Sequence, residues 1–291
     1  MKTRGATRND RILLWGLRGA SVLASSIVLL IVYFLLAESL PALRRIGIAR
    51  FVTDGDWLPS TAEGENQYRL VPMLAATLLS TLGAVLIAAP AGLLSAVFCH
   101  FYAPKALATL QRRIVELLAG IPSVIYGFWG LVTLVPILQR LAPPGQNLLA
   151  GILVLTLMIL PTIAMLASAT LATIPQAHLQ GAAALGLSRW TTLRGVVLPE
   201  AAPGLLIALL LGTMRAVGET MAVLMVCGNV VQIPTSLFDP VRTLTANIAL
   251  EMGYATSEHR SVLFVSGLAL MALVVLLIGL QRQFRRSVTL V

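Results

Sequence analysis

The chain has 291 residues, of which 57% are hydrophobic and 11% are charged, and its formal net charge is +9. Soluble domains contain about 25% charged residues, so this composition excludes an ordinary soluble domain. The positive charge does not indicate nucleic-acid binding, because the basic residues lie mostly in short loops and at the termini. The apolar residues are concentrated in long runs, which predicts an integral membrane protein surrounded by lipid.

Six apolar segments are long enough to cross about 30 Å of hydrocarbon as α-helices. The first follows a basic tail but is longer than the roughly 7–15 residues of a signal-peptide core, so we expect it to stay as a membrane helix. These segments predict an all-α membrane domain over 15–281, with tails at 1–14 and 282–291. The expected spans are 15–37, 74–101, 114–138, 148–171, 204–228 and 262–281.

Lysine and arginine predict the orientation of these spans. They are more frequent in the two tails and in the loops around 102–113 and 172–203 than in the other loops. The positive-inside rule therefore predicts that both termini and the 172–203 loop are cytoplasmic. On the opposite side, the 38–73 loop contains Trp57 and Tyr68, which we interpret as anchors at the membrane interface.

Few residues of the chain offer catalytic or metal-binding chemistry. Cys99 and Cys227 lie in apolar stretches and are interpreted as packing residues, not as a disulfide. The three histidines lack the spacing of metal ligands, so no metal, cofactor or catalytic site is expected. The only lysines, Lys2 and Lys105, do not follow a glycine-rich phosphate-binding pattern, so any ATP hydrolysis must occur in another polypeptide.

The 172–203 loop resembles the cytoplasmic coupling loop of ATP-driven importers. Their permeases carry Glu-Ala-Ala, three residues, Gly, nine residues and Ile-x-Leu-Pro. This pattern predicts a short helix of small residues that docks in a groove of an ATPase subunit, although an amphipathic helix on the membrane surface is the alternative. The matching positions are Ala182, Gly186, Leu198 and Pro199, and the departing ones are Gln180, Gly181 and Val196.

The local chemistry of this loop predicts its shape. A break is expected at Gly186, followed by a second short helix with Ser188 as its N-cap. Pro199 would then lie in the first turn of the next span, where proline is tolerated.

Arg215 and Glu219 are the one charged pair well inside a predicted span. Each charge near the bilayer centre costs about 2.5–3.5 kcal/mol, so such residues are functional candidates. Their i, i+4 spacing predicts that they pair on one helical face. Arginine offers two parallel donors to an oxyanion, and Glu219 would keep Arg215 from holding the anion too tightly. A buried ion pair that only fixes the helix is the alternative.

Three strings extend the resemblance over roughly residues 50–280. These strings, STLGAVLIAAPAGLLSAVF (80–98), RIVELLAGIPSVIYGFWG (113–130) and RAVGETMAVLMVCGN (215–229), are similar to phosphate-importer permeases of the PstC type. The resemblance implies a type I ABC importer permease (MetI-like) fold in a bacterial inner membrane. It also implies that Arg215 and Glu219 lie on the substrate path.

The same resemblance implies the partners. They are a homologous second permease, two cytoplasmic ATPase subunits and a periplasmic phosphate-binding protein, with lipid around the spans and no nucleic acid. Two rival functions stay open at this point. One is import of another oxyanion, such as molybdate or sulfate; the other is a secondary carrier or channel that uses no ATPase.

Overall fold

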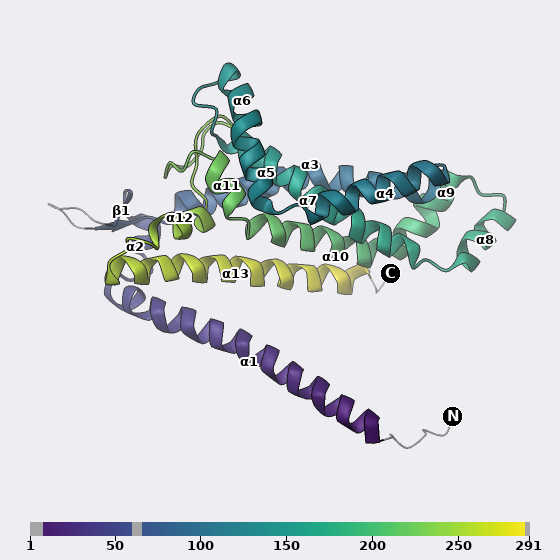
Figure 1. Ribbon diagram of the computed structural model, residues 1–291, viewed down its shortest axis with the longest axis horizontal. Helices are drawn as coiled ribbons and strands as arrows, with labels where there is room; N and C mark the ends of the chain where they lie inside the picture. Colours follow the sequence, from purple (N-terminus) through teal and green to yellow (C-terminus); the bar gives the residue numbers. More distant parts are fainter. Residues whose placement is uncertain (1–7, 60–65, 289–291) are drawn as a thin grey trace.

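The computed structural model describes residues 8–59 and 66–288. The chain is almost entirely helical in this part, and six of its helical segments are long and apolar enough to cross a membrane. The prediction of six spans is therefore confirmed. The long helices lie roughly along one direction, with the α8–α9 loop at one end and a small β-hairpin at the other (Figure 1).

The first half of the chain contains four long helical segments and the hairpin. Its helix α1 runs beyond both ends of the predicted span, and two π-helical turns, η1 and η2, interrupt later segments. The elements are α1 (Arg8–Arg45), α2 (Arg50–Thr53), β1 (Trp57–Leu58), β2 (Gln67–Tyr68), α3 (Val71–Val97), η1 (Phe98–Tyr102), α4 (Lys105–Gly120), α5 (Ser123–Trp129), η2 (Gly130–Leu134) and α6 (Val135–Leu141).

The second half holds the most buried helix and the loop that resembles a coupling loop. A third π-helical turn, η3, leads into α10. The elements are α7 (Leu148–Ala172), α8 (Gln176–Ala184), α9 (Arg189–Thr192), η3 (Leu193–Val197), α10 (Leu198–Val217), α11 (Met221–Val226), α12 (Leu244–Glu251) and α13 (Ser257–Val288).

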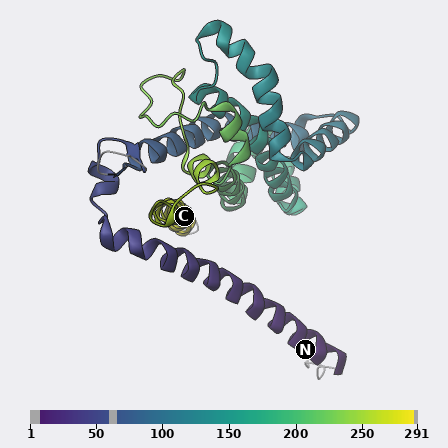
Figure 2. The same cartoon turned by 60° about the vertical axis from the view of Figure 1, so that its left-hand side comes forward.

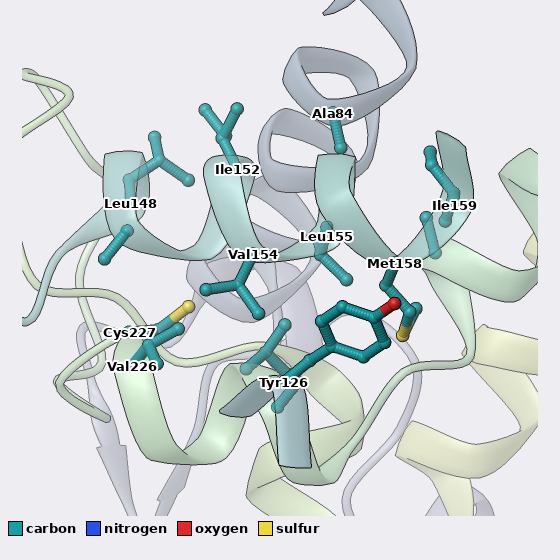
Figure 3. Close-up of a cluster of buried hydrophobic side chains, with 14 of the residues drawn as sticks. Ala84, Tyr126, Leu148, Ile152, Val154, Leu155, Met158, Ile159, Val226 and Cys227 are labelled. Atoms are coloured by element: carbon teal, nitrogen blue, oxygen red, sulfur yellow. The ribbon is translucent and has the colours of Figure 1, made fainter. Parts of the chain in front are cut away.

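Helix α7 is the centre of the fold. Of its most apolar 18-residue window 67% is buried, against 28% or less for each of the other five spans. Asn147 begins the helix as an N-cap, its side chain accepting a hydrogen bond from the backbone N–H of Ala150. Figure 3 shows Tyr126 of α5 and Cys227, just after α11, on one side of α7, with Ala84 of α3 on another. The apolar, all-round character of α7 is thus explained by neighbours on several sides.

The third predicted span, 114–138, is wrong at its start. Helix α4 ends at Gly120, and Ile121 and Pro122 are extended before α5 begins at Ser123. The proline has no backbone N–H and its ring disfavours helix at the residue before it, so the break falls there. The span that the structure supports is Ser123–Leu141. Tyr126 bridges the break, donating its hydroxyl proton to the carbonyl of Leu118 at 2.8 Å.

Trp57 and Tyr68 are not anchors at a membrane interface, since their exposed fractions are 5% and 1%. They pair across the hairpin and belong to an apolar cluster with residues of α12 and α13. The indole N–H of Trp57 donates to Glu251 at 2.9 Å. Glu251 also accepts from Arg242 at 2.6 Å and bonds His259 at 2.8 Å. This buried polar cluster joins the hairpin to the start of α13.

Gly127 of α5 permits a close approach to α11. A Cβ at Gly127 would lie 2.7 Å from the Cα of Ala222, a contact that only a backbone shift could relieve. Gly120, seven residues earlier, has no heavy atom within 4 Å of such a Cβ. Small residues of this kind let membrane helices pack backbone to backbone.

We predict that Gly127→Ala lowers the free energy of unfolding by about 1–3 kcal/mol, because the added methyl group overpacks the α5–α11 contact. The measurement is the melting temperature of the purified protein in detergent. Gly120→Ala serves as the control and should leave the melting temperature unchanged or slightly raised. Equal melting temperatures for both variants would contradict the close contact.

The Glu251 cluster predicts a pH-dependent stability. Burial raises the pKa of Glu251, but the hydrogen bonds from His259 and Trp57 and the charge of Arg242 outweigh it, so the pKa lies below its ordinary value. A carboxylate with a depressed pKa contributes stability above the unfolded pKa of about 4.3, and this is lost as the pH falls through the folded value.

We therefore expect Glu251→Gln to melt well below the wild type at pH 7, since removing one partner of a buried charge cluster costs about 3–5 kcal/mol. The gap should shrink as the pH falls below about 4. Glu258→Gln is the control, because Glu258 is exposed at the same end. A gap that stays constant down to low pH would show that the charge of Glu251 is not what stabilises the cluster.

Candidate functional site

The loop between α7 and α10 has the local structure that its sequence predicts. Helix α8 ends at Ala184, and Gly186 has a left-handed φ of +70°. The N–H of Leu187 bonds the carbonyl of Ala182, and the N–H of Gly186 bonds that of Ala183, at 3.1 and 3.0 Å. This is a Schellman motif with glycine at its left-handed position, so the glycine of the pattern has a backbone reason.

The second half of the loop also follows the prediction. Ser188 is the N-cap of α9, its hydroxyl accepting from the backbone N–H of Thr191 at 3.2 Å. Leu193 and Val197 are buried, and Leu198 and Pro199 form the first turn of α10. The loop is therefore a compact helix–turn–helix whose two ends are continuous with the bundle.

The small residues of α8 do not all face outward. Ala182 is only 5% exposed, so it packs against its own chain, whereas Gln180 and Gly181 are exposed. Two large apolar side chains protrude beside them, Leu185 at 80% exposed and Trp190 at 61%. Sequence reasoning missed these two, although a tryptophan in a basic loop is itself a signal.

A polar contact ties α8 to α10. His178 Nδ1 lies 2.7 Å from the Glu200 carboxylate, with both side chains partly exposed. Sequence reasoning missed this pair too, because the residues are 22 positions apart and nothing in their local pattern links them.

At the other end of α10, the structure separates Arg215 from Glu219. The helix ends at Val217, Gly218 is its C-cap, and α11 starts only at Met221. The predicted span 204–228 is therefore not one helix, and the prediction that the pair shares a helical face is wrong. Within residues 8–59 and 66–288 the two side chains form no ion pair. The end of α10 thus lies between the two residues.

Each of the two residues has a different partner. The half-buried Arg215 donates from Nη1 to the hydroxyl of Thr162 at 3.1 Å, one residue after Pro161 in α7. Glu219 turns to α11, accepting from the backbone N–H of Ala222 at 3.0 Å, while its own carbonyl accepts from Thr245 at 2.7 Å. Glu219 thus stabilises the helix break, as an acidic side chain does at a helix N-terminus.

Arg215 keeps most of its hydrogen-bonding capacity. A guanidinium has five N–H donors, and one of them is used by Thr162. No carboxylate among the described residues neutralises its charge. A cation within the helical span Arg189–Val217 with unused parallel donors is suited to bind an oxyanion.

Metal chemistry has no support in the described residues, where no three His, Cys, Asp or Glu side chains gather. Both cysteines are free; Cys227 is buried and Cys99 is partly exposed.

Comparisons with known proteins decide the family. Residues 88–290 match the family described as "Binding-protein-dependent transport system inner membrane component". A probable ABC transporter permease of Bacillus subtilis, YqgH, is 40% identical over 80% of this chain and 76% of its own length. The chain belongs to this permease family. Two phosphate transport system permease proteins PstC, from Mesorhizobium japonicum and Haemophilus influenzae, are 34% and 32% identical over 91% and 87% of this chain and 86% and 88% of their own.

Solved ABC importers agree with the fold of this permease. A subunit of the MetNI methionine transporter in inward-facing conformations is 26% identical, with a TM-score of 0.58 over 75% of this chain and 94% of the other. A chain of the bacterial alginate transporter, solved with an alginate-bound periplasmic protein, gives a TM-score of 0.66 at 17% identity, over 96% of this chain and 97% of the other. The predicted MetI-like fold is confirmed.

Family membership also confirms that this multi-pass permease is a transport subunit and not an enzyme. Permeases of this kind work with ATPase subunits and a periplasmic binding protein. A secondary carrier or channel, one of the two rivals from the sequence, is therefore excluded.

Proposed function

We propose that this permease forms half of the translocation path of an ATP-driven importer of inorganic phosphate. The observation that carries the proposal is Arg215, a half-buried guanidinium inside a span with no carboxylate partner in the described chain. The names of the PstC relatives support phosphate as the anion. Phosphate presents oxygens in pairs, which the two parallel N–H groups of arginine can bind together.

In this mechanism Thr162 and Glu219 are positioning residues. Thr162 accepts a hydrogen bond from Nη1 of Arg215 and so holds the guanidinium against α7. Glu219 stabilises the start of α11 and thereby the break directly after Arg215. A helix that ends beside the anion is able to change its angle at the break without losing its internal hydrogen bonds, which the hydrocarbon would otherwise leave unpaired.

The α8–α9 loop is the proposed contact with a cytoplasmic ATPase subunit. It lies at the same end of the molecule as the C-terminal end of α13 and the N-terminal end of α1, which supports a cytoplasmic position for all three (Figure 1). Gln180 and Gly181 would face the ATPase together with Leu185 and Trp190. Ala182 would instead pack α8 against the rest of the chain, because it is buried.

The outer partners follow from the opposite end of the molecule. A periplasmic phosphate-binding protein would dock over the β1–β2 hairpin and the loop before α12. Exposed apolar side chains on α5 and α6, among them Phe128, Trp129 and Ile137, would face the homologous second permease or lipid. ATP binding would push the α8–α9 loop and open the path outward, and hydrolysis would reset it.

The direct test is uptake of labelled phosphate, at micromolar supply, by bacteria that lack this chain and by the same cells after its restoration. Cells that lack the chain should lose phosphate uptake, and restoration of the chain should recover it. Excess sulfate or molybdate should not inhibit the recovered uptake. Uptake of phosphate that is unaffected by loss of the chain would overturn the proposal; restored uptake of sulfate or molybdate instead would assign that anion.

Arg215→Ala should lower phosphate uptake about tenfold to a hundredfold at unchanged expression, because charge-assisted hydrogen bonds to an ion contribute about 1.5–3 kcal/mol. Arg140→Ala removes an equal charge from an exposed position on α6 and should transport normally. Normal uptake by Arg215→Ala would remove Arg215 from the path.

Trp190→Ala should weaken binding of the ATPase subunits to the permease about thirtyfold, since an exposed aromatic at the centre of an interface commonly contributes 2 kcal/mol or more. The measurement is titration of purified ATPase subunit against permease in nanodiscs. Tyr254→Ala is the control, because Tyr254 is 69% exposed at the opposite end of the molecule. If both variants bound equally well, the α8–α9 loop would lose its assigned role.

A further inference from the structure

A cavity of about 240 Å³ lies between α3, α4 and α7, near the end of the molecule that carries the α8–α9 loop. Helix α4 has one apolar face and one face that lines the cavity. Leu110, Ile114 and Leu117 are exposed to the outside, while Arg112 and Glu116 line the cavity. Two charged side chains of α4, Arg112 and Glu116, therefore lie at an open cavity between this helix, α3 and α7, and both remain exposed there. Ionisable groups near a membrane-spanning bundle commonly mark a polar path.

The lining of the cavity is mostly apolar and includes a few groups that can donate hydrogen bonds. Ser95 of α3 accepts at its hydroxyl oxygen from the Gln111 amide at 2.6 Å, which leaves the hydroxyl proton of Ser95 free to donate. Ser168 of α7 adds a second hydroxyl. Arg112 makes no hydrogen bond or ion pair with any residue of the described chain, Glu116 included. A guanidinium with two hydroxyls suits a small oxyanion, and the volume leaves room for accompanying water.

The position of the cavity relates it to Arg215. Thr162, which holds Arg215, is followed on the same face of α7 by Met165 and Ala169, and both line the cavity. Six residues of helix separate Thr162 from Ser168, an axial distance of about 9 Å. The cavity therefore lies within two helical turns of Thr162, the partner of Arg215, in the direction of the α8–α9 end.

We infer that the α3–α4–α7 cavity is a second oxyanion site, in which Arg112 binds the anion after it leaves Arg215. The inference rests on the proposed function and adds a binding residue to it. Arg112 and the hydroxyls of Ser95 and Ser168 hold the anion. Glu116, with its carboxylate in the same cavity, weakens that hold and lets the anion leave.

The chain offers a matched control in the adjacent residue. Arg113 is exposed like Arg112 and carries the same charge, but it does not line the cavity. In the complete transporter reconstituted in proteoliposomes, Arg112→Ala should reduce phosphate uptake about tenfold, whereas Arg113→Ala should match the wild type. Equal uptake by the two variants would overturn the inference.

A second measurement reports binding directly and does not require transport. Cys99 lines the cavity, whereas Cys227 is 1% exposed, so a small thiol reagent distinguishes the two in the native chain. Inorganic phosphate should slow modification of Cys99 in the wild type and in Arg113→Ala, but not in Arg112→Ala. Glu116→Gln should achieve the same protection at a severalfold lower phosphate concentration, an effect that mere damage to the fold would not produce.

The two readouts separate failure of the inference from failure of the proposed function. If the wild type transports phosphate but Cys99 is not protected, the cavity is not an anion site. If the wild type does not transport phosphate, the proposed function fails, and protection of Cys99 by phosphate still decides whether the cavity binds an oxyanion.

Discussion

The structure depends on close packing around α7. Lipid tails are as apolar as leucine, so helices in a membrane gain little from burying apolar surface alone and associate through van der Waals contact. Small residues provide that contact: Gly92 of α3 and Gly212 of α10 both meet Ile163, where an added Cβ would lie 3.0 and 2.6 Å from its atoms. Because α3, α5, α10 and α11 all pack against α7, their contacts with it determine their positions.

The second constraint is the backbone itself. Where a span is interrupted, its freed N–H and C=O groups must find partners inside the protein. The two main interruptions, at Pro122 and Gly218, are both bridged by side chains from their immediate surroundings, Tyr126 in the first case and Glu219 in the second. The break at Gly218 lies directly after the helix that carries Arg215, where the substrate path is proposed.

Much of the fold could be predicted from the sequence, because a segment that crosses lipid must be long and apolar. The α8–α9 loop could be predicted for a different reason: Gly186 and Ser188 have backbone roles that depend on only a few neighbouring residues. The MetI-like fold followed from the resemblance, and the comparisons support it.

What the sequence did not predict depends on tertiary contacts. The prediction from the i, i+4 spacing of Arg215 and Glu219 assumed a continuous helix, but α10 ends at Val217. Pro122 indicated that the third span starts later than expected, since a proline disfavours helix at the residue before it. Trp57 was assigned to the interface because tryptophan is frequent there, but its partner Glu251 lies 194 positions away. The contact between Thr162 and Arg215 and the cavity beside α4 could not be predicted, because both depend on which helices pack against each other.

Helix α1 stands apart from the rest of the bundle. It meets α13 near the hairpin end, where Phe34 packs against Phe264 and Ser261 bonds the backbone of Glu38, and it then diverges (Figure 2). The match to the permease family begins only at residue 88, well after this helix. The most apolar window of α1 is not buried by the described chain, so its apolar surface is left to lipid or to a partner subunit.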